Sequence, residues 1–188
     1  MRGDLAGRRL DIDWITDDLA IGGCFPLQAA ERLAREDGVR HIVDVRQEAC
    51  DEEAVLLRHG IAFLHLPTQD SCAIAPAMLR EGVTWVGAAL DGGNRVLVHC
   101  QYGIGRSALL ALCVMVSRGW APLAALEQAK RVRRIVSPSP EQLRTFIAHA
   151  GQVHAAAGAA WDLPTFDALA AIAYRHIVAA EGAATGGR

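Results

Sequence analysis

The sequence predicts an α/β fold with a central, mostly parallel sheet that is flanked by helices on both sides. Between residues 39 and 116, short runs rich in β-branched residues alternate with segments of helical periodicity. This order is typical of parallel strands joined by crossover helices. Residues 96–98 are entirely apolar, as in a strand buried on both faces. Residues 108–116 are apolar on every side, as in a helix enclosed by a core.

The first two thirds of the chain are expected to alternate between strands and helices. Residues 14–21, with Asp17 and Asp18 in the middle, predict two short strands joined by a turn. Pro26 at a first helical position starts a helix that ends near Gly38. Strands follow at residues 39–45, 61–66 and 96–98, and helices at residues 51–59, 76–90, 107–116 and 122–134.

The last part of the chain predicts two further helices. Residues 139–142, Ser-Pro-Glu-Gln, form a capping box that opens the first of them. Residues 155–160 are a small-residue linker, and Asp162 caps an extra C-terminal helix that has Pro164 early in it. We expect this helix to pack back on the domain or to form a homodimer contact through its apolar residues, which are Phe166, Leu169, Ile172 and Ile177.

The domain organisation follows from these elements. A chain of 188 residues is long enough for one ordinary domain and short for two. We expect residues 1–11 to be a mobile N-terminal arm and residues 12–150 to be the domain itself. Residues 151–188 then hold the linker, the C-terminal helix and a disordered tail over residues 182–188.

The segment His-Cys-Gln-Tyr-Gly-Ile-Gly-Arg-Ser, residues 99–107, joins the strand at 96–98 to the buried helix. Such a turn aims successive backbone N–H groups at one point, where the helix dipole adds positive charge. Gly103 and Gly105 permit the torsions that this cradle needs. The N–H groups lower the pKa of the Cys100 thiol, and the Arg106 guanidinium can grip two oxygens of a tetrahedral dianion. The segment therefore predicts an anion-binding loop with a thiolate nucleophile at its floor.

This segment is similar to the HCxxGxxRS signature of Cys-dependent protein phosphatases. The run at residues 15–22 resembles the opening hairpin of dual-specificity phosphatase domains, and residues 134–143 resemble their final signature, with Ser139 where Asn is more usual. Residues 12–150 are accordingly identified as a dual-specificity phosphatase-like domain of a small, bacterial type. The resemblance implies that the fold is the one of that family, with the extra C-terminal helix as an addition.

The resemblance also assigns roles to the residues. Cys100 is the nucleophile, and residues 101–106 (Gln101, Tyr102, Gly103, Ile104, Gly105 and Arg106) bind the phosphate. The family takes its general acid from an upstream loop, where Asp70 follows a predicted strand; Asp44 is the alternative, although it is expected to orient the loop or to pair with Arg46.

Two residues that flank this loop also receive roles from the resemblance. His99 is implied to form hydrogen bonds within the loop and to help set the thiol pKa. Ser107 is expected to donate a hydrogen bond to the Cys100 sulfur and to help it leave in the second step of the reaction.

These residues predict an enzyme that hydrolyses phosphotyrosine, and also phosphoserine or phosphothreonine, through a phosphocysteine intermediate. One alternative is a non-protein substrate such as an inositol phosphate or lipid, a nucleotide or an RNA end. The loop has no Lys, which argues against a polyanionic substrate, while the basic residues at 130–134 favour one. We interpret this cluster as a solvated helix end, with a second anion contact as the alternative. A third alternative is a module that binds phosphate without turnover. Sulfur transfer is a further alternative, but it fits poorly with the Arg-Ser pair at the end of the loop.

The composition limits partners and compartment. A net charge of −2 gives no overall attraction to nucleic acid or membrane. The resemblance implies a phosphorylated protein substrate as the partner. No cofactor or metal is expected, because His149 and His154 have the wrong spacing for one helical face. Five cysteines without a CxxC pair, and no signal segment, predict reduced thiols in a cytoplasmic protein. Cys72 is interpreted as an ordinary loop thiol, with a protective disulfide to Cys100 as the alternative.

Overall fold

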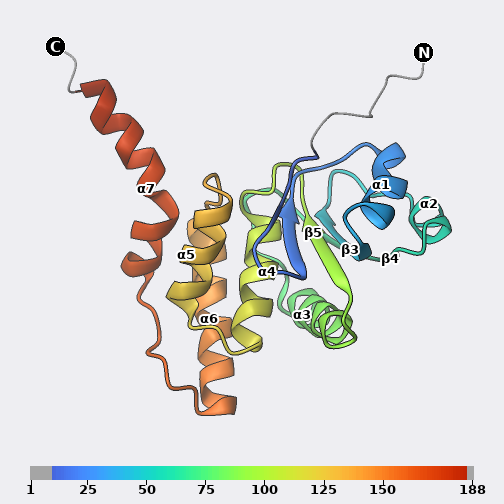
Figure 1. Ribbon diagram of the computed structural model, residues 1–188. Coiled ribbons are helices and arrows are strands. Elements are labelled where there is room, and N and C mark those ends of the chain that lie inside the picture. Colours follow the sequence, from blue (N-terminus) through green and yellow to red (C-terminus); the bar gives the residue numbers. More distant parts are fainter. Residues whose placement is uncertain (1–9, 186–188) are drawn as a thin grey trace.

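The structure is a computed structural model that describes residues 10–185, with side chains described as far as residue 176. A five-stranded sheet lies at the centre, in the strand order β1-β2-β5-β3-β4, with helices on both of its faces (Figure 1). All strand pairs are parallel except β1 with β2. The predicted fold class is therefore confirmed. The expected mobile arm falls almost wholly, at residues 1–9, outside the described residues.

The central strand leads directly to the predicted anion-binding loop. Strand β5 (Arg95–His99) pairs in parallel with β2 and β3 on either side, and its three apolar residues at 96–98 are fully buried. The carboxyl end of β5 therefore lies in the middle of the sheet edge where ligands bind in such folds. The other strands are β1 (Ile12–Trp14), β2 (Leu19–Gly22), β3 (Val39–Arg46) and β4 (Ala62–Thr68).

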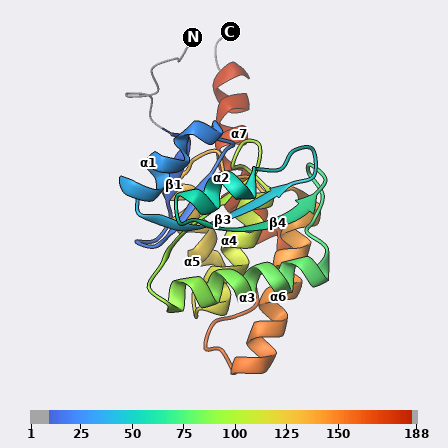
Figure 2. The same cartoon turned by 90° about the vertical axis from the view of Figure 1, so that its right-hand side faces the viewer.

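The helices divide between the two faces of the sheet (Figure 2). One face is covered by α1 (Ala30–Arg35), which follows a short 3-10 turn at Leu27–Ala29, and by α2 (Glu53–Arg58). The other face packs against α3 (Pro76–Asp91) and α4 (Arg106–Ser117). Every residue of α4 except the last is buried, as its uniformly apolar sequence predicts. Pro26 precedes the 3-10 turn instead of starting an α-helix, so the predicted helix from 26 to 38 is shorter and begins later.

Helix α5 (Pro122–Val132) buries the apolar Leu126 and Ala129 and, on the same side, the charged Lys130. Leu123 is 38% exposed, whereas Lys130 is buried. The Lys130 Nζ donates hydrogen bonds to the carbonyls of Val136 and Ala173, each at 2.6 Å. Arg133, which follows the helix, is buried as well. The interpretation of residues 130–134 as a solvated helix end was wrong for Lys130 and Arg133, because both donate to backbone carbonyls of other segments, whereas Arg131 and Arg134 are exposed as expected.

Helix α6 (Pro140–Ala157) begins at the predicted capping box. The Ser139 Oγ accepts a hydrogen bond from the Gln142 N–H, and the Gln142 Oε1 accepts one from the Ser139 N–H. The helix ends at Gly158, whose φ of 60° is left-handed. Residues 155–157, predicted as linker, are therefore helical.

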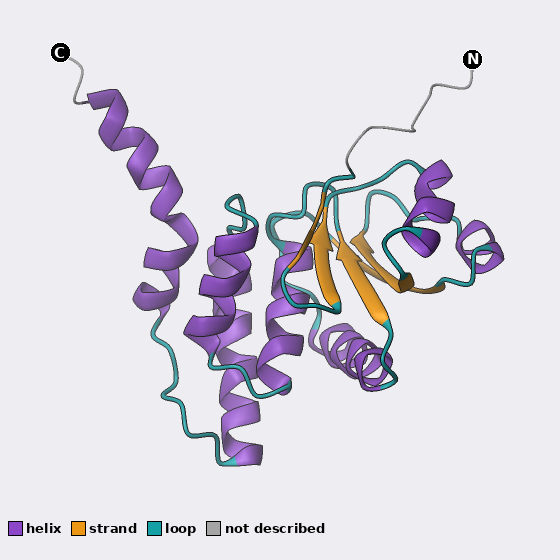
Figure 3. Cartoon of the chain, viewed as in Figure 1, coloured by secondary structure: helices purple, strands orange, loops and turns teal. Residues whose placement is uncertain are grey.

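The last helix, α7 (Phe166–Thr185), forms the outermost layer (Figure 3). The Thr165 Oγ1 accepts the N–H of Ala168, so Thr165 caps this helix where Asp162 was expected to. Leu169 and Ala173 are buried against the domain, so this helix packs back on α5 and α6. The helix also continues through residues 182–185, which were expected to be disordered. No helix within the described part of the chain has the length and apolar character to cross a bilayer.

Candidate active site

Four consecutive carbonyl groups of the loop between β5 and α4 are held from outside the loop. Each accepts a hydrogen bond from another part of the chain, and two of the four come from one arginine side chain. The bonds run from the Cys24 N–H to Gln101 (3.1 Å), from the Arg133 Nη2 to Tyr102 (2.8 Å), from the Arg133 Nε to Gly103 (2.9 Å) and from the Ser137 N–H to Ile104 (2.9 Å).

The direction of these carbonyls fixes the direction of the N–H groups. A trans peptide is planar, so the N–H of each following residue points to the opposite side. The N–H groups of residues 102–105 therefore face the inside of the loop, and the Gly103 N–H donates to the Cys100 Sγ at 3.3 Å. Gly103 has a φ of 64°, and a Cβ there would lie 2.6 Å from the backbone carbon of Gly22. Only glycine fits this position.

The Cys100 thiol lies at the floor of this loop and is 3% exposed. Its Sγ is 3.3 Å from the Ser107 Oγ. Burial alone raises the pKa of this thiol, but hydrogen bonds from the Ser107 hydroxyl and from backbone N–H groups outweigh burial and lower the pKa. Cys113 lies on α4 in the hydrophobic core and shows the opposite effect, because burial raises the pKa of its thiol. The loop thus favours the thiolate at Cys100, and Ser107 lies where the sequence predicted.

Arg106 is buried and is held by two groups at the ends of neighbouring strands. Its two terminal nitrogens each donate to one carboxylate oxygen of Glu48 at 2.7 Å, and Nη1 also donates to the Thr68 carbonyl at 2.9 Å. The hydrogen bond from Arg106 lowers the pKa of Glu48 to about 2. The sequence predicted that Arg106 binds two oxygens of a phosphate. In the structure, the guanidinium forms this bidentate contact with the carboxylate of Glu48.

Asp70 lies beside the same guanidinium. Its Oδ1 is 3.1 Å from the Arg106 Nη2, and its side chain is 69% exposed. The two residues line a cleft of about 480 Å³ together with Gln47, Glu48, Gln69, Gln101 and Tyr102. The structure therefore brings Asp70, Arg106, Gln101 and Tyr102 together, as the sequence predicted. Asp44, the alternative acid, is fully buried and paired with Arg46, which agrees with the role expected for it.

The start of α6 holds the loop that carries Asp70. The Ser139 Oγ donates to the Ser71 carbonyl at 2.7 Å, and the Gln142 Nε2 donates to the Cys72 carbonyl at 2.9 Å. Gln142 also lies against the nucleophile loop, since a Cβ on Gly105 would be 2.6 Å from its Oε1. The two capping residues therefore contact both loops of the cleft. All five cysteines, Cys72 included, are free thiols.

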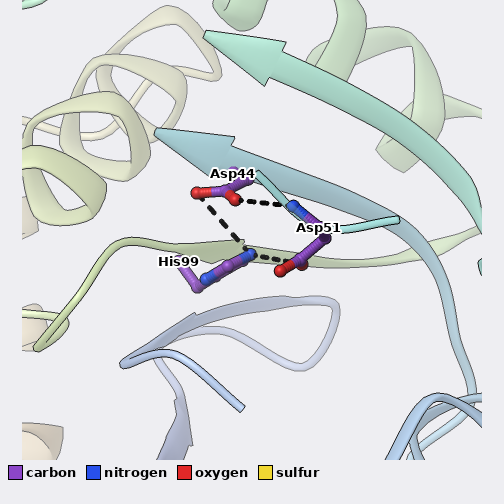
Figure 4. Close-up of side chains that lie close together, drawn as sticks. All are labelled: Asp44, Asp51 and His99. Atoms are coloured by element: carbon purple, nitrogen blue, oxygen red, sulfur yellow. Dashed lines mark hydrogen bonds and ion pairs between the residues drawn. The ribbon is translucent and has the colours of Figure 1, made fainter. Parts of the chain in front are cut away.

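His99 contacts an acidic network instead of the loop. Its Nε2 lies 2.9 Å from the Asp51 Oδ2 and 4.0 Å from the Asp44 Oδ1 (Figure 4). These three side chains have the ligand types and spacing of a metal site. However, the Arg46 Nη2 contacts one oxygen of each carboxylate at 2.7 Å, so a guanidinium already supplies the positive charge. The cluster is a buried ion-pair network that holds the end of β5 to the segment after β3.

Sequence reasoning missed two residues that shape the site, Glu48 and Asp51, and it missed the contact of Arg133 with the loop carbonyls. Glu48 follows the carboxyl end of β3 by two residues, which is the same signal that pointed to Asp70 after β4. Arg133 had no such signal, because its partners are loop carbonyls about 30 residues away in sequence.

Comparisons with known proteins agree with this geometry. The family model described as "Dual specificity phosphatase, catalytic domain" matches residues 24–152. The chain is 32% identical to dual specificity protein phosphatase 2 of Mus musculus over 79 residues, which are 41% of this chain and 25% of that protein. It is 36% identical to dual specificity protein phosphatase 4 of Homo sapiens over 76 residues, which are 39% of this chain and 19% of that protein. The match thus spans about a quarter or less of the length of these relatives.

Solved structures share the fold. A mouse putative dual specificity phosphatase complexed with zinc tungstate has a TM-score of 0.72 at 21% identity, covering 86% of this chain and 100% of that chain. PTPMT1 in complex with PI(5)P has a TM-score of 0.71 at 24% identity, covering 76% of this chain and 96% of that chain.

Replacing the arginine that holds the loop carbonyls should destabilise the fold. We expect Arg133→Gln to lower the free energy of unfolding by about 3 kcal/mol, because it leaves two loop carbonyls and the carboxylates of Asp11 and Asp13 without their guanidinium. Urea denaturation measures the change. The exposed neighbour Arg134, which makes no ion pair with the described residues, serves as control, and Arg134→Gln should stay within about 0.5 kcal/mol of wild type. Equal losses in the two variants would contradict this role of Arg133.

Removing the hydroxyl beside the sulfur should move the titration of the thiol. In Ser107→Ala one donor to the thiolate is lost, so the pKa of Cys100 rises and less thiolate is present at neutral pH. Alkylation by iodoacetamide, followed on the Cys100 peptide by mass spectrometry across pH, should slow severalfold at pH 6–7. Ser117→Ala at the other end of α4 should leave the profile unchanged. An unshifted pH profile in Ser107→Ala would show that Ser107 does not lower the pKa of Cys100.

Glu48 should weaken anion binding, because it holds the guanidinium that an oxyanion needs. We expect Glu48→Gln to tighten the binding of inorganic phosphate about 3–10-fold in calorimetric titrations, since a neutral amide binds Arg106 less strongly and repels the anion less. Glu52→Gln, a nearby exposed change of the same charge, is the control. Weaker binding in Glu48→Gln would mean that Glu48 positions Arg106 for the anion instead of competing with it.

Proposed function

The chain belongs to the dual-specificity phosphatase catalytic-domain family, and from this premise we propose that it is a Cys-dependent phosphatase that acts on phosphorylated proteins. The substrates are phosphotyrosine and also phosphoserine or phosphothreonine side chains. The observation that carries this proposal is the position of the Cys100 thiol beneath inward-facing N–H groups that lower its pKa, in the loop whose residues Gln101, Tyr102 and Arg106 line the cleft with Asp70.

The reaction proceeds in two steps. The Cys100 thiolate attacks phosphorus, and the bond from phosphorus to the leaving oxygen breaks as the S–P bond forms. Asp70 in its acid form gives a proton to that oxygen, so that a neutral hydroxyl leaves. The Asp70 carboxylate then takes a proton from a water molecule that attacks phosphorus, and the S–P bond breaks to release phosphate and thiolate. The Ser107 hydroxyl stabilises the departing sulfur anion. N–H groups of the loop and the Arg106 guanidinium stabilise the equatorial oxygens.

The composition of the cleft supports a substrate with a single phosphate. Arg106 is the one cation among the described residues that line it, and Glu48 and Asp70 add two carboxylates. A polyanionic substrate would meet these carboxylates without further cations to bind its other charges. The exposed ring of Tyr102, also at the cleft, offers an apolar contact for an aromatic leaving group.

An inositol phosphate or lipid remains the alternative substrate class. A structural neighbour was crystallised with PI(5)P, but at 24% identity this likeness concerns the fold. The basic residues that favoured such a substrate are also placed differently from that expectation. Lys130 and Arg133 are buried in structural contacts, and neither lines the described cleft. Substrate choice is tested by kcat/KM on phosphotyrosyl peptides, phosphothreonyl peptides and inositol phosphates. A preference for the inositol phosphates would overturn the protein-phosphatase assignment.

The remaining expectations about context are part of this proposal. The protein acts in the cytoplasm on a phosphorylated protein partner, where its thiols stay reduced. A homodimer through α7 is still a prediction, to be examined by sedimentation.

Changing the proposed acid should slow turnover without unfolding the protein. We expect Asp70→Asn to lower kcat for p-nitrophenyl phosphate and phosphopeptides by about 10²–10⁴, because an amide cannot protonate the leaving oxygen. The exposed Asp162→Asn is a matched control and should keep wild-type activity. Cys100→Ser should abolish turnover while retaining the wild-type melting temperature. Near-normal activity in Asp70→Asn would show that another group is the acid, and near-normal activity in Cys100→Ser would sink the nucleophile assignment.

A further inference from the structure

A second group of cations lines a cavity where α5 meets α7. The cavity measures about 360 Å³. None of the described residues that line it is acidic, and none of them also lines the catalytic cleft. It is lined by Lys130, Arg131, Arg134, Arg175 and His176.

The positive charge at the back of this cavity is not neutralised by an ion pair. The buried Lys130 Nζ donates to the carbonyls of Val136 and Ala173 and to the His176 Nδ1 at 2.8 Å. These three short bonds match the three protons of an ammonium, the Ser137 Oγ lies farther away at 3.4 Å, and none of the acceptors is a carboxylate. Burial, together with repulsion from Arg175 and Arg134, lowers the pKa of Lys130 to about 8.

The other cations still have donors available for a ligand. Arg134 is exposed and forms no hydrogen bond or ion pair with the described residues. Arg131 contacts only the neutral Gln128 among those residues. Because an ammonium only donates, the His176 Nδ1 accepts from Lys130, and the ring keeps its proton on Nε2 as a second kind of donor. Arg175 is the one member of the group that is paired, with Glu127 at 2.7 Å.

We propose that this cavity is a binding site for a small, multiply charged phosphate anion of the diphosphate type. Arg131 and Arg134 contact the anion from the end of α5, and His176 from α7, while the buried charge of Lys130 adds attraction without direct contact. A diphosphate suits the site better than a single carboxylate, because several separate donors converge on it with no acidic residue among the described residues of its lining.

The site would be a property of this chain and not of the matched family domain. Two of the five residues that line it, Arg175 and His176, come from α7, which lies beyond residues 24–152. The anion would connect α7 to α5, next to the existing contact between Arg175 and Glu127. The site would therefore also strengthen the packing of the extra C-terminal helix on the domain.

Titration of the full chain with sodium pyrophosphate, at constant ionic strength and pH 7, tests the proposal by NMR. We expect the His176 ring signals to shift and saturate. We expect Arg134→Gln to weaken that binding about tenfold, which is the loss of one charge-assisted contact. Arg80→Gln, which removes an exposed arginine on α3 outside the cavity, should change the dissociation constant less than twofold. Binding at the catalytic loop is followed separately through the amide signals of Tyr102 and Gly103.

Two outcomes would overturn the site. In one, the His176 signals do not shift saturably, even though those of Tyr102 and Gly103 do. In the other, Arg80→Gln weakens binding as much as Arg134→Gln, which would mean a general attraction to net charge. Saturable shifts at His176 that Arg134→Gln weakens support the site whether or not the catalytic loop binds pyrophosphate, so the test is independent of the proposed phosphatase activity.

Discussion

The guanidinium of Arg133 is the contact on which the geometry of the catalytic loop depends. Its side chain is only 3% exposed, and its nitrogens donate to two consecutive loop carbonyls and to the carboxylates of Asp11 and Asp13. A carbonyl that turned inward would bring a partial negative charge to the thiolate and to any bound oxyanion. By fixing the outward direction of the carbonyls, Arg133 fixes the inward direction of the N–H groups. The reactive sulfur thus depends on a residue that never touches it.

The catalytic cleft has little net positive charge. The one guanidinium among its described residues, that of Arg106, lies near the carboxylates of Glu48 and Asp70 and near Cys100, whose lowered pKa favours the thiolate. Anion binding there cannot come from an excess of cations, so it must come from directed donors, which are the loop N–H groups and the fork of Arg106. Such a site selects by geometry. We expect it to favour one tetrahedral dianion at the loop and to disfavour additional charges nearby, which is the physical basis of the monophosphate substrates proposed above.

The sequence predicted those elements that depend on local residue patterns. The strand and helix around the Cys100 loop follow from apolar periodicity, and the start of α6 follows from its capping box. The same patterns could not predict which cations are buried. Lys130 is covered because the Ala173 carbonyl, from a helix outside the matched family domain, lies 2.6 Å from its Nζ. Burial of a charged side chain depends on partners that are distant in sequence, and periodicity carries no information about them. Glu48 is an intermediate case, because the sequence shows its place after a strand but does not show that Arg106 is its partner.

The capping residues of α6 contact both the loop that carries Asp70 and the loop that carries Cys100. Ser139 and Gln142 satisfy the first N–H groups of the helix and, through their remaining donors, also hold the carbonyls of Ser71 and Cys72. Gln142 lies at the same time against Gly105 in the nucleophile loop. One helix start therefore sets the position of the loop that carries Asp70 relative to the loop that carries Cys100. The exposed Asp70 is thereby kept close to Arg106. In this chain, the distance between the proposed acid and the proposed nucleophile is a consequence of how a helix in the second half of the chain is capped.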